Sequence, residues 1–115
     1  MVQYSSRLDA TFGALSDPTR RGILQRLGRG DASITELADA FSMTLTGMKK
    51  HVQILEDAGF LRSEKVGRVR TCSLAPRPLD EESRWIAKYS EMLDSRLDAL
   101  GEFLERTKPE RKERS

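Results

Sequence analysis

Two short helical segments stand one after the other in the middle of the chain, and a strand pattern follows the second at once. Residues 33–36 read Ser-Ile-Thr-Glu, which is a capping box in front of the first helix. Thr44 is a suitable N-cap for the second helix, and Gly59 is a suitable residue to end it. Residues 60–74 are rich in Val, Thr and Arg, which predicts two short strands joined around residues 66–67. Two such helices and a hairpin in this order are typical of a winged helix-turn-helix.

Helical spacing also marks the two ends of the chain. Apolar residues predict a first helix over residues 5–15. Asp17 followed by Pro18 predicts the start of a second helix, which stops at the glycines of residues 28–30. The longest apolar stripe predicts a helix from residue 79 to about 106. We therefore expect a mainly α fold with a small β-hairpin wing.

Composition excludes several classes of protein. The chain has 115 residues, 37% hydrophobic and 33% charged, which suits one compact domain over residues 1–106. Residues 107–115 hold four basic and two acidic side chains, so this tail carries the whole net charge of +2, and we expect it to be disordered. No segment has the length of a bilayer span or the pattern of a signal peptide, so we expect a cytoplasmic protein with no membrane partner.

The second short helix has the layout of a recognition helix. One stripe of apolar residues should face the core; it consists of Leu45, Met48, Val52 and Leu55. Lys50 lies opposite this stripe with Thr46 and Gln53 near it, so these three side chains are placed to reach base edges in a major groove. Lys49 and His51 lie on the flanks, where they could contact phosphates. Gly47 would let the backbone approach DNA closely. The alternative is a solvated helix face with ordinary charges.

The predicted hairpin carries Lys65, Arg68 and Arg70 with no acidic residue between them. Such a tip can contact a phosphate backbone or enter a minor groove, whereas the alternative is a solvated hairpin. Ser33 and Thr35 are weaker candidates for phosphate contact through exposed helix amides. The full set of predicted DNA-binding residues is Ser33, Thr35, Thr44, Thr46, Gly47, Lys49, Lys50, His51, Gln53, Lys65, Arg68 and Arg70.

Three segments together resemble the ArsR/SmtB family of bacterial repressors. Residues 14–24 (ALSDPTRRGIL) resemble the opening signature of the family, residues 50–61 (KHVQILEDAGFL) its recognition-helix stretch, and residues 67–74 (GRVRTCSL) its wing. The similarity covers roughly residues 8–104. It implies a homodimeric winged-helix repressor that binds an inverted-repeat operator in double-stranded DNA and pairs through its first and last helices.

The implied dimer interface consists of Leu8, Phe12, Trp85, Tyr89, Met92, Leu93, Leu97 and Leu100. The apolar pattern supports this placement, because the last helix has a long apolar stripe and no later element to cover it. The alternative is packing within the monomer. A pocket for a small apolar effector, lined by Trp85, Tyr89 and Met92, is a further alternative to plain interface packing.

The sequence argues against metal and thiol sensing. The helix before the recognition helix has no cysteine, and the last helix has acidic residues but no histidine, so we expect no metal site and no cofactor. The single cysteine, Cys72, shares strand parity with Leu74 and is better suited to the core than to redox chemistry. One histidine, one cysteine and no glycine-rich phosphate loop also argue against an enzyme. The competing function is a winged-helix protein-interaction module that has lost DNA binding.

Overall fold

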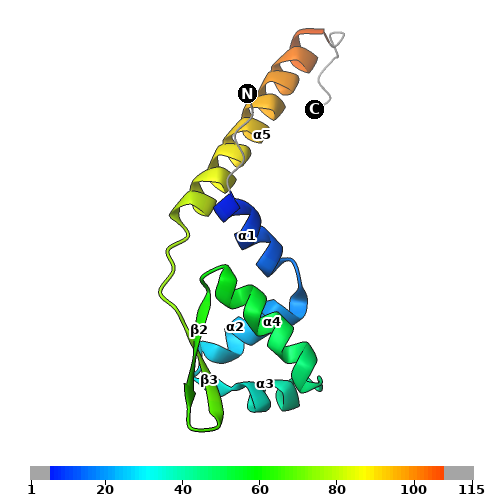
Figure 1. Cartoon of the computed structure of the whole chain (residues 1–115). Coiled ribbons are helices and arrows are strands. Elements are labelled where there is room, and N and C mark those ends of the chain that lie inside the picture. The colour runs from blue at the N-terminus through cyan, green and yellow to red at the C-terminus, as the bar shows by residue number, and fades with distance from the viewer. Residues whose placement is uncertain (1–5, 108–115) are drawn as a thin grey trace. The chain divides into compact units, whose positions relative to one another are not determined.

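The computed structural model describes residues 6–107, which form the predicted four helices, hairpin and long last helix together with one short additional strand (Figure 1). The elements are α1 (Ser6–Leu15), α2 (Pro18–Leu27), β1 (Ala32–Ser33), α3 (Ile34–Ala40), α4 (Leu45–Asp57), β2 (Leu61–Val66), β3 (Val69–Leu74) and α5 (Asp80–Thr107). The contacts divide the chain into two compact units, Met1–Pro78 and Leu79–Ser115. The predicted disordered tail lies outside the described residues except for Thr107, which ends α5.

Side-chain caps fix the starts of the two central helices, as predicted. The Ser33 hydroxyl accepts from the Glu36 N–H at 3.0 Å, and the Glu36 carboxylate accepts from the Ser33 N–H at 2.8 Å. This bond from the Ser33 N–H lowers the pKa of Glu36. The Thr44 hydroxyl accepts from the Gly47 N–H at 3.0 Å. Gly59 follows α4 with φ +85°, a conformation that favours glycine. Thr44 therefore holds the α4 side of the short turn between the helices, and on the α3 side the Met43 N–H donates to the Ala38 carbonyl at 2.9 Å.

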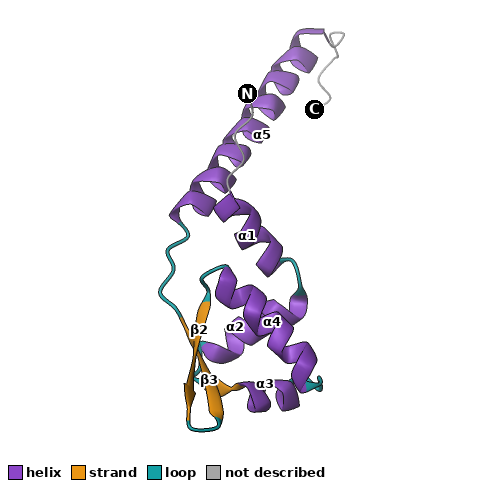
Figure 2. Ribbon diagram, in the orientation of Figure 1, coloured by secondary structure: helices purple, strands orange, loops and turns teal. Residues whose placement is uncertain are grey.

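The core of the first unit lies among α2, α3, α4 and the sheet (Figure 2). Met48, Val52 and Leu55 of α4 are buried, which confirms most of the predicted stripe. The prediction that Leu45 faces the core is wrong, because its side chain is 44% exposed. It is the first residue of α4, and it lines a groove beside the wing instead of packing in the core.

The sheet has three antiparallel strands in the order β1-β3-β2. The hairpin is the predicted one: Leu61 pairs with Leu74 and Val66 with Val69, and Gly67 makes the turn with φ +64°. The sequence analysis missed β1, which pairs Ala32 with Cys72. A strand of two residues is too short to show alternation, so only its partner strand reveals it.

The second unit consists mainly of α5, a helix of 28 residues with three acidic residues in its first turn. Its apolar side chains are exposed along the whole length, from Trp85 to Leu104, each by about half of its surface. Within residues 6–107, no helix has the length and apolar character needed to cross a membrane.

Candidate nucleic-acid interface

A groove of about 430 Å³ lies between the wing and the starts of α3 and α4. Four cationic side chains line it and no carboxylate does; the lining residues are Ser33, Ile34, Thr35, Leu45, Lys49, Lys65, Arg68, Val69 and Arg70. Cations from two separate elements on a shared concave surface create a positive potential that suits a phosphate backbone. The groove therefore unites the wing and one flank of α4 in a single anion-attracting surface.

Six of the predicted DNA-binding residues line this groove: Ser33, Thr35, Lys49, Lys65, Arg68 and Arg70. Thr46, Lys50 and Gln53 lie outside it and are exposed on α4. Thr44 is exposed and Gly47 is half-buried at the start of that helix, where the hydroxyl of the first caps the amide of the second. The amides of Ser33 and Glu36 are engaged within the capping box, so the groove wall at α3 offers side chains more than amides.

Gln53 is held on the exposed face of α4. Its Nε2 donates to Asp57 Oδ1 at 2.8 Å, one helical turn further along. This bond orients the amide before any ligand arrives. A fixed amide on an exposed helix face is the kind of group that can pair with a base edge.

His51 is half-buried, and its ring lies beside Arg20 of α2. Arg20 Nη1 lies 3.2 Å from His51 Nδ1, and because arginine only donates, Nδ1 is the acceptor. Arg20 also donates to the carbonyls of Gly13 at 3.0 Å and Ala14 at 2.8 Å, at the end of α1. Arg20 therefore joins the end of α1 to the recognition helix, although it was not among the predicted site residues.

Asp17 caps the helix that carries Arg20. Its carboxylate accepts from the Arg20 N–H at 3.1 Å. Desolvation acts to raise its pKa, but the backbone bonds from Arg20 and Thr19 outweigh this and lower it. Asp17 therefore stays ionised and helps to fix the start of α2.

A second set of bonds joins α4 to the wing. Glu56 Oε1 accepts from the Ser63 hydroxyl at 3.1 Å, and Glu56 Oε2 accepts from the Ser63 N–H at 3.4 Å. Arg70 Nη1 donates to the same hydroxyl at 3.0 Å. Glu56 and Ser63 were not predicted from the sequence, because the register of β2 against β3 brings Ser63 near Arg70 and only the packing of α4 on β2 adds Glu56.

Cys72 is fully buried in β3, which confirms its predicted place in the core. Burial, together with the Glu56 carboxylate, raises the pKa of the thiol to about 11. Since the thiolate is the reactive form, this cysteine is unreactive at neutral pH.

The predicted interface residues of α5 are exposed on a single helix. Trp85 and Tyr89 stack with their ring centroids 5.8 Å apart. Ile86 and Phe103 share the exposure but were absent from the predicted set. Of the two predicted residues on α1, Phe12 is exposed and Leu8 is half-buried.

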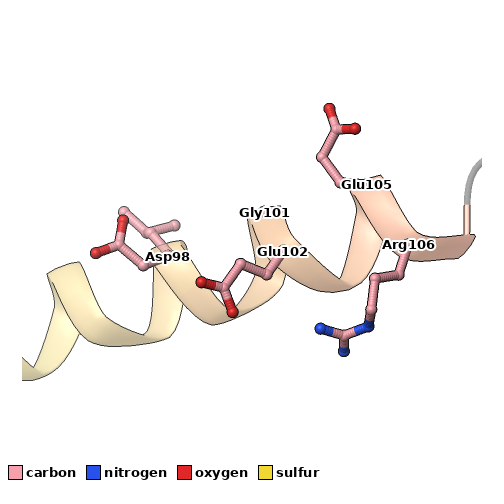
Figure 3. A pocket seen from close by; sticks show the side chains of 6 residues that line it. Asp98, Gly101, Glu102, Glu105 and Arg106 are labelled. Atoms are coloured by element: carbon pink, nitrogen blue, oxygen red, sulfur yellow. The ribbon is translucent and has the colours of Figure 1, made fainter.

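The acidic residues of α5 do not converge. Asp98, Glu102 and Glu105 border a shallow hollow with Arg106, but in Figure 3 Glu105 points away from Asp98 and Glu102. Among residues 6–107, no group of three or more His, Cys, Asp or Glu side chains could hold a metal ion.

Known proteins match both the sequence and the fold. Residues 15–64 match a family model described as a helix-turn-helix domain. The crystal structure of an ArsR family transcriptional regulator is 45% identical and covers 83% of this chain and 98% of its own, with a TM-score of 0.71. An ArsR-like transcriptional regulator from Rhodococcus sp. RHA1 is 32% identical, covers 90% of this chain and 94% of its own, and has a TM-score of 0.74. The transcriptional repressor SdpR of Bacillus subtilis is 29% identical over 82 residues, which are 71% of this chain and 91% of that protein. By their names, all three of these relatives are regulators of transcription.

Proposed function

The chain belongs to the ArsR family of transcriptional regulators, and on that premise we propose that it is a homodimeric repressor of an inverted-repeat operator. The observation that carries the proposal is the groove with four cations beside the exposed face of α4. Since the target is chromosomal DNA, the regulator acts in the cytoplasm. SdpR, a repressor by name, supports the direction of the regulation.

In this proposal the two sides of α4 have different tasks. Thr46, Lys50 and Gln53 enter the major groove and contact base edges. Lys49 and the wing cations hold phosphates of the adjoining strand, which adds affinity without reading sequence. His51 contacts a phosphate from the flank of α4 opposite Lys49.

We propose that residues 1–106 act as one DNA-binding and dimerisation domain. The apolar face of α5, with Leu8 and Phe12 of α1, supplies the interface between two copies. Two-fold symmetry then presents two recognition helices about 34 Å apart, which matches half-sites one turn apart on a palindrome. We assign Trp85, Tyr89 and Met92 to this interface rather than to an effector pocket.

We also propose that the repressor responds to no metal. The carboxylates of α5 are not accompanied by histidine or cysteine on that helix, and zinc prefers nitrogen and sulfur ligands. The test is DNA release: zinc or nickel added to the complex should leave its affinity unchanged.

The first experiment is binding to the DNA upstream of the protein's own gene. Mobility shifts across a salt series, with footprinting, should give a protected palindrome and a steep fall of affinity with salt. In a control variant, both Lys65 and Arg68 are replaced by alanine. This variant lacks two positive charges of the wing, so it should bind the same DNA more weakly than the wild type and with a smaller salt dependence. Absence of protection at low salt, from a folded dimer, would reject this operator. Absence of binding in a genome-wide selection as well would favour the interaction module.

A further inference from the structure

The bonds between Glu56, Ser63 and Arg70 run from the recognition helix to the basic groove. Glu56 belongs to α4, whereas Ser63 and Arg70 belong to the two strands of the wing. Both oxygens of the carboxylate are used on one residue, since Oε1 accepts the Ser63 hydroxyl and Oε2 its N–H. Arg70, at the end of this chain of bonds, lines the groove.

The direction of the Ser63 hydroxyl follows from the charges around it. A hydroxyl has one proton to donate and two lone pairs to accept with. Carboxylate oxygens only accept and guanidinium nitrogens only donate, so the proton points to Glu56 and a lone pair faces Arg70. Both bonds that Ser63 donates therefore end on the Glu56 carboxylate.

The position of Ser63 makes it a fixed point. It pairs with the fully buried Cys72 in the ladder, and Lys65 pairs with Arg70 two residues further along. Arg70 therefore reaches diagonally back across the hairpin to a residue whose backbone and side chain are both tied to α4. One N–H of Arg70 is used in this way, and the guanidinium has four others for a phosphate.

We propose that Glu56 is a positioning residue of the DNA interface: acting through Ser63, it sets the guanidinium of Arg70 in the groove. The proposal rests on the proposed function, because it assigns Arg70 to a phosphate. Holding Arg70 in place before binding removes part of the entropy cost of ordering a long side chain. Glu56 itself touches no DNA.

The test compares Glu56→Gln with Glu64→Gln. Both changes remove one negative charge near the wing, but Glu64 is exposed and pairs across the ladder with Thr71. Glutamine at position 56 replaces one of the two acceptor oxygens by an NH2 group that only donates, so it cannot accept from the N–H and the hydroxyl of Ser63 with two separate atoms. A similar size keeps the fold, and thermal unfolding with circular dichroism checks this. Ser63→Ala is the second variant, because it removes the hydroxyl and leaves the carboxylate.

The first readout needs no DNA. In the free protein, NMR of the Arg70 side chain should show a guanidinium that becomes more mobile and exchanges faster in Glu56→Gln and Ser63→Ala, but not in Glu64→Gln. An Arg70 signal equal in all four proteins would overturn the positioning role whatever the protein binds. This readout also separates the two proposals, since loss of wild-type DNA binding would reject the function alone.

The second readout is operator affinity across a salt series. Glu56→Gln should bind about five-fold more weakly than Glu64→Gln, with a slope of log affinity against log salt that is smaller by up to about 0.9. In an Arg70→Ala background, Glu56→Gln should weaken binding no further, because the contact it positions is already gone. Equal affinity and slope for the two glutamine variants would overturn the proposal, as would a further five-fold loss in the Arg70→Ala background.

Discussion

Raising the pH above 9 should destabilise this protein through Cys72. The ordinary pKa of the thiol, 9.0, applies to the unfolded chain, and in the folded protein it is about 11. Burial is the main cause and the charge of Glu56 adds to it. The folded state therefore binds the thiol proton more tightly than the unfolded state does. This stability is fully present below pH 9 and is lost as the pH rises through 11.

The size of the loss follows from the two pKa values. At pH 10 the unfolded thiol is mostly ionised while the folded one is mostly neutral, which costs about 1.4 kcal/mol. At pH 11 the loss reaches about 2.3 kcal/mol, again relative to neutral pH. A change of about 1.4 kcal/mol is a measurable part of the stability of a small domain.

The assay is urea unfolding of wild type and Cys72→Ala at about pH 8 and about pH 10, at equal protein concentration. The alanine variant loses packing at both pH values. The amount by which its free energy of unfolding falls below that of the wild type at pH 8 therefore measures the cost of the cavity. At pH 10 the deficit should shrink by about 1.4 kcal/mol, because only the wild type has the thiol to titrate. Titration of lysine and tyrosine cancels in the difference. A deficit that is the same at both pH values would refute the argument that the fold holds this thiol neutral.

Three further substitutions test the interface and the dimer. Arg68→Ala should weaken binding to all DNA sequences about equally and lower the salt slope by about 0.9, measured by titration over a salt series; an unchanged slope would remove Arg68 from the phosphate contacts. Lys50→Ala should change the preferred bases in a binding selection, and an unaltered preference would place Lys50 outside the base contacts. Trp85→Ala should raise the dissociation constant of the dimer while helix content stays constant, measured by sedimentation and circular dichroism. A variant still fully dimeric at low concentration would remove Trp85 from the interface.

Most of the fold could be predicted because its boundaries are local. The Ser33 and Thr44 caps lie within three residues of the amides that they bind, so a short stretch of sequence specifies where each helix begins. Gly59 and Gly67 mark turns for the same reason. The winged helix-turn-helix followed from the order of these local signals.

What the sequence could not show depends on contacts between distant residues. Strand β1 exists because β3 lies beside it, and Leu45 is exposed because it lines the groove beside the wing and not the core. Glu56 has the pattern of an ordinary charge on a helix until β2 turns back against α4 and brings Ser63 to it. In the same way, Arg20 joins residues 13 and 51 only after α1 and α4 have packed.

Ser33 has a double role that limits how this fold can vary in length. It is the last residue of β1, paired with Thr71 of the wing, and also the N-cap of α3. One added or deleted residue between Ala32 and Glu36 would break either the ladder or the capping box, since no shift satisfies both. The exposed turn at residues 28–31 neither pairs in the ladder nor caps α3. Changes in length should therefore gather in that turn, where the chain can lengthen without moving α3 relative to the wing.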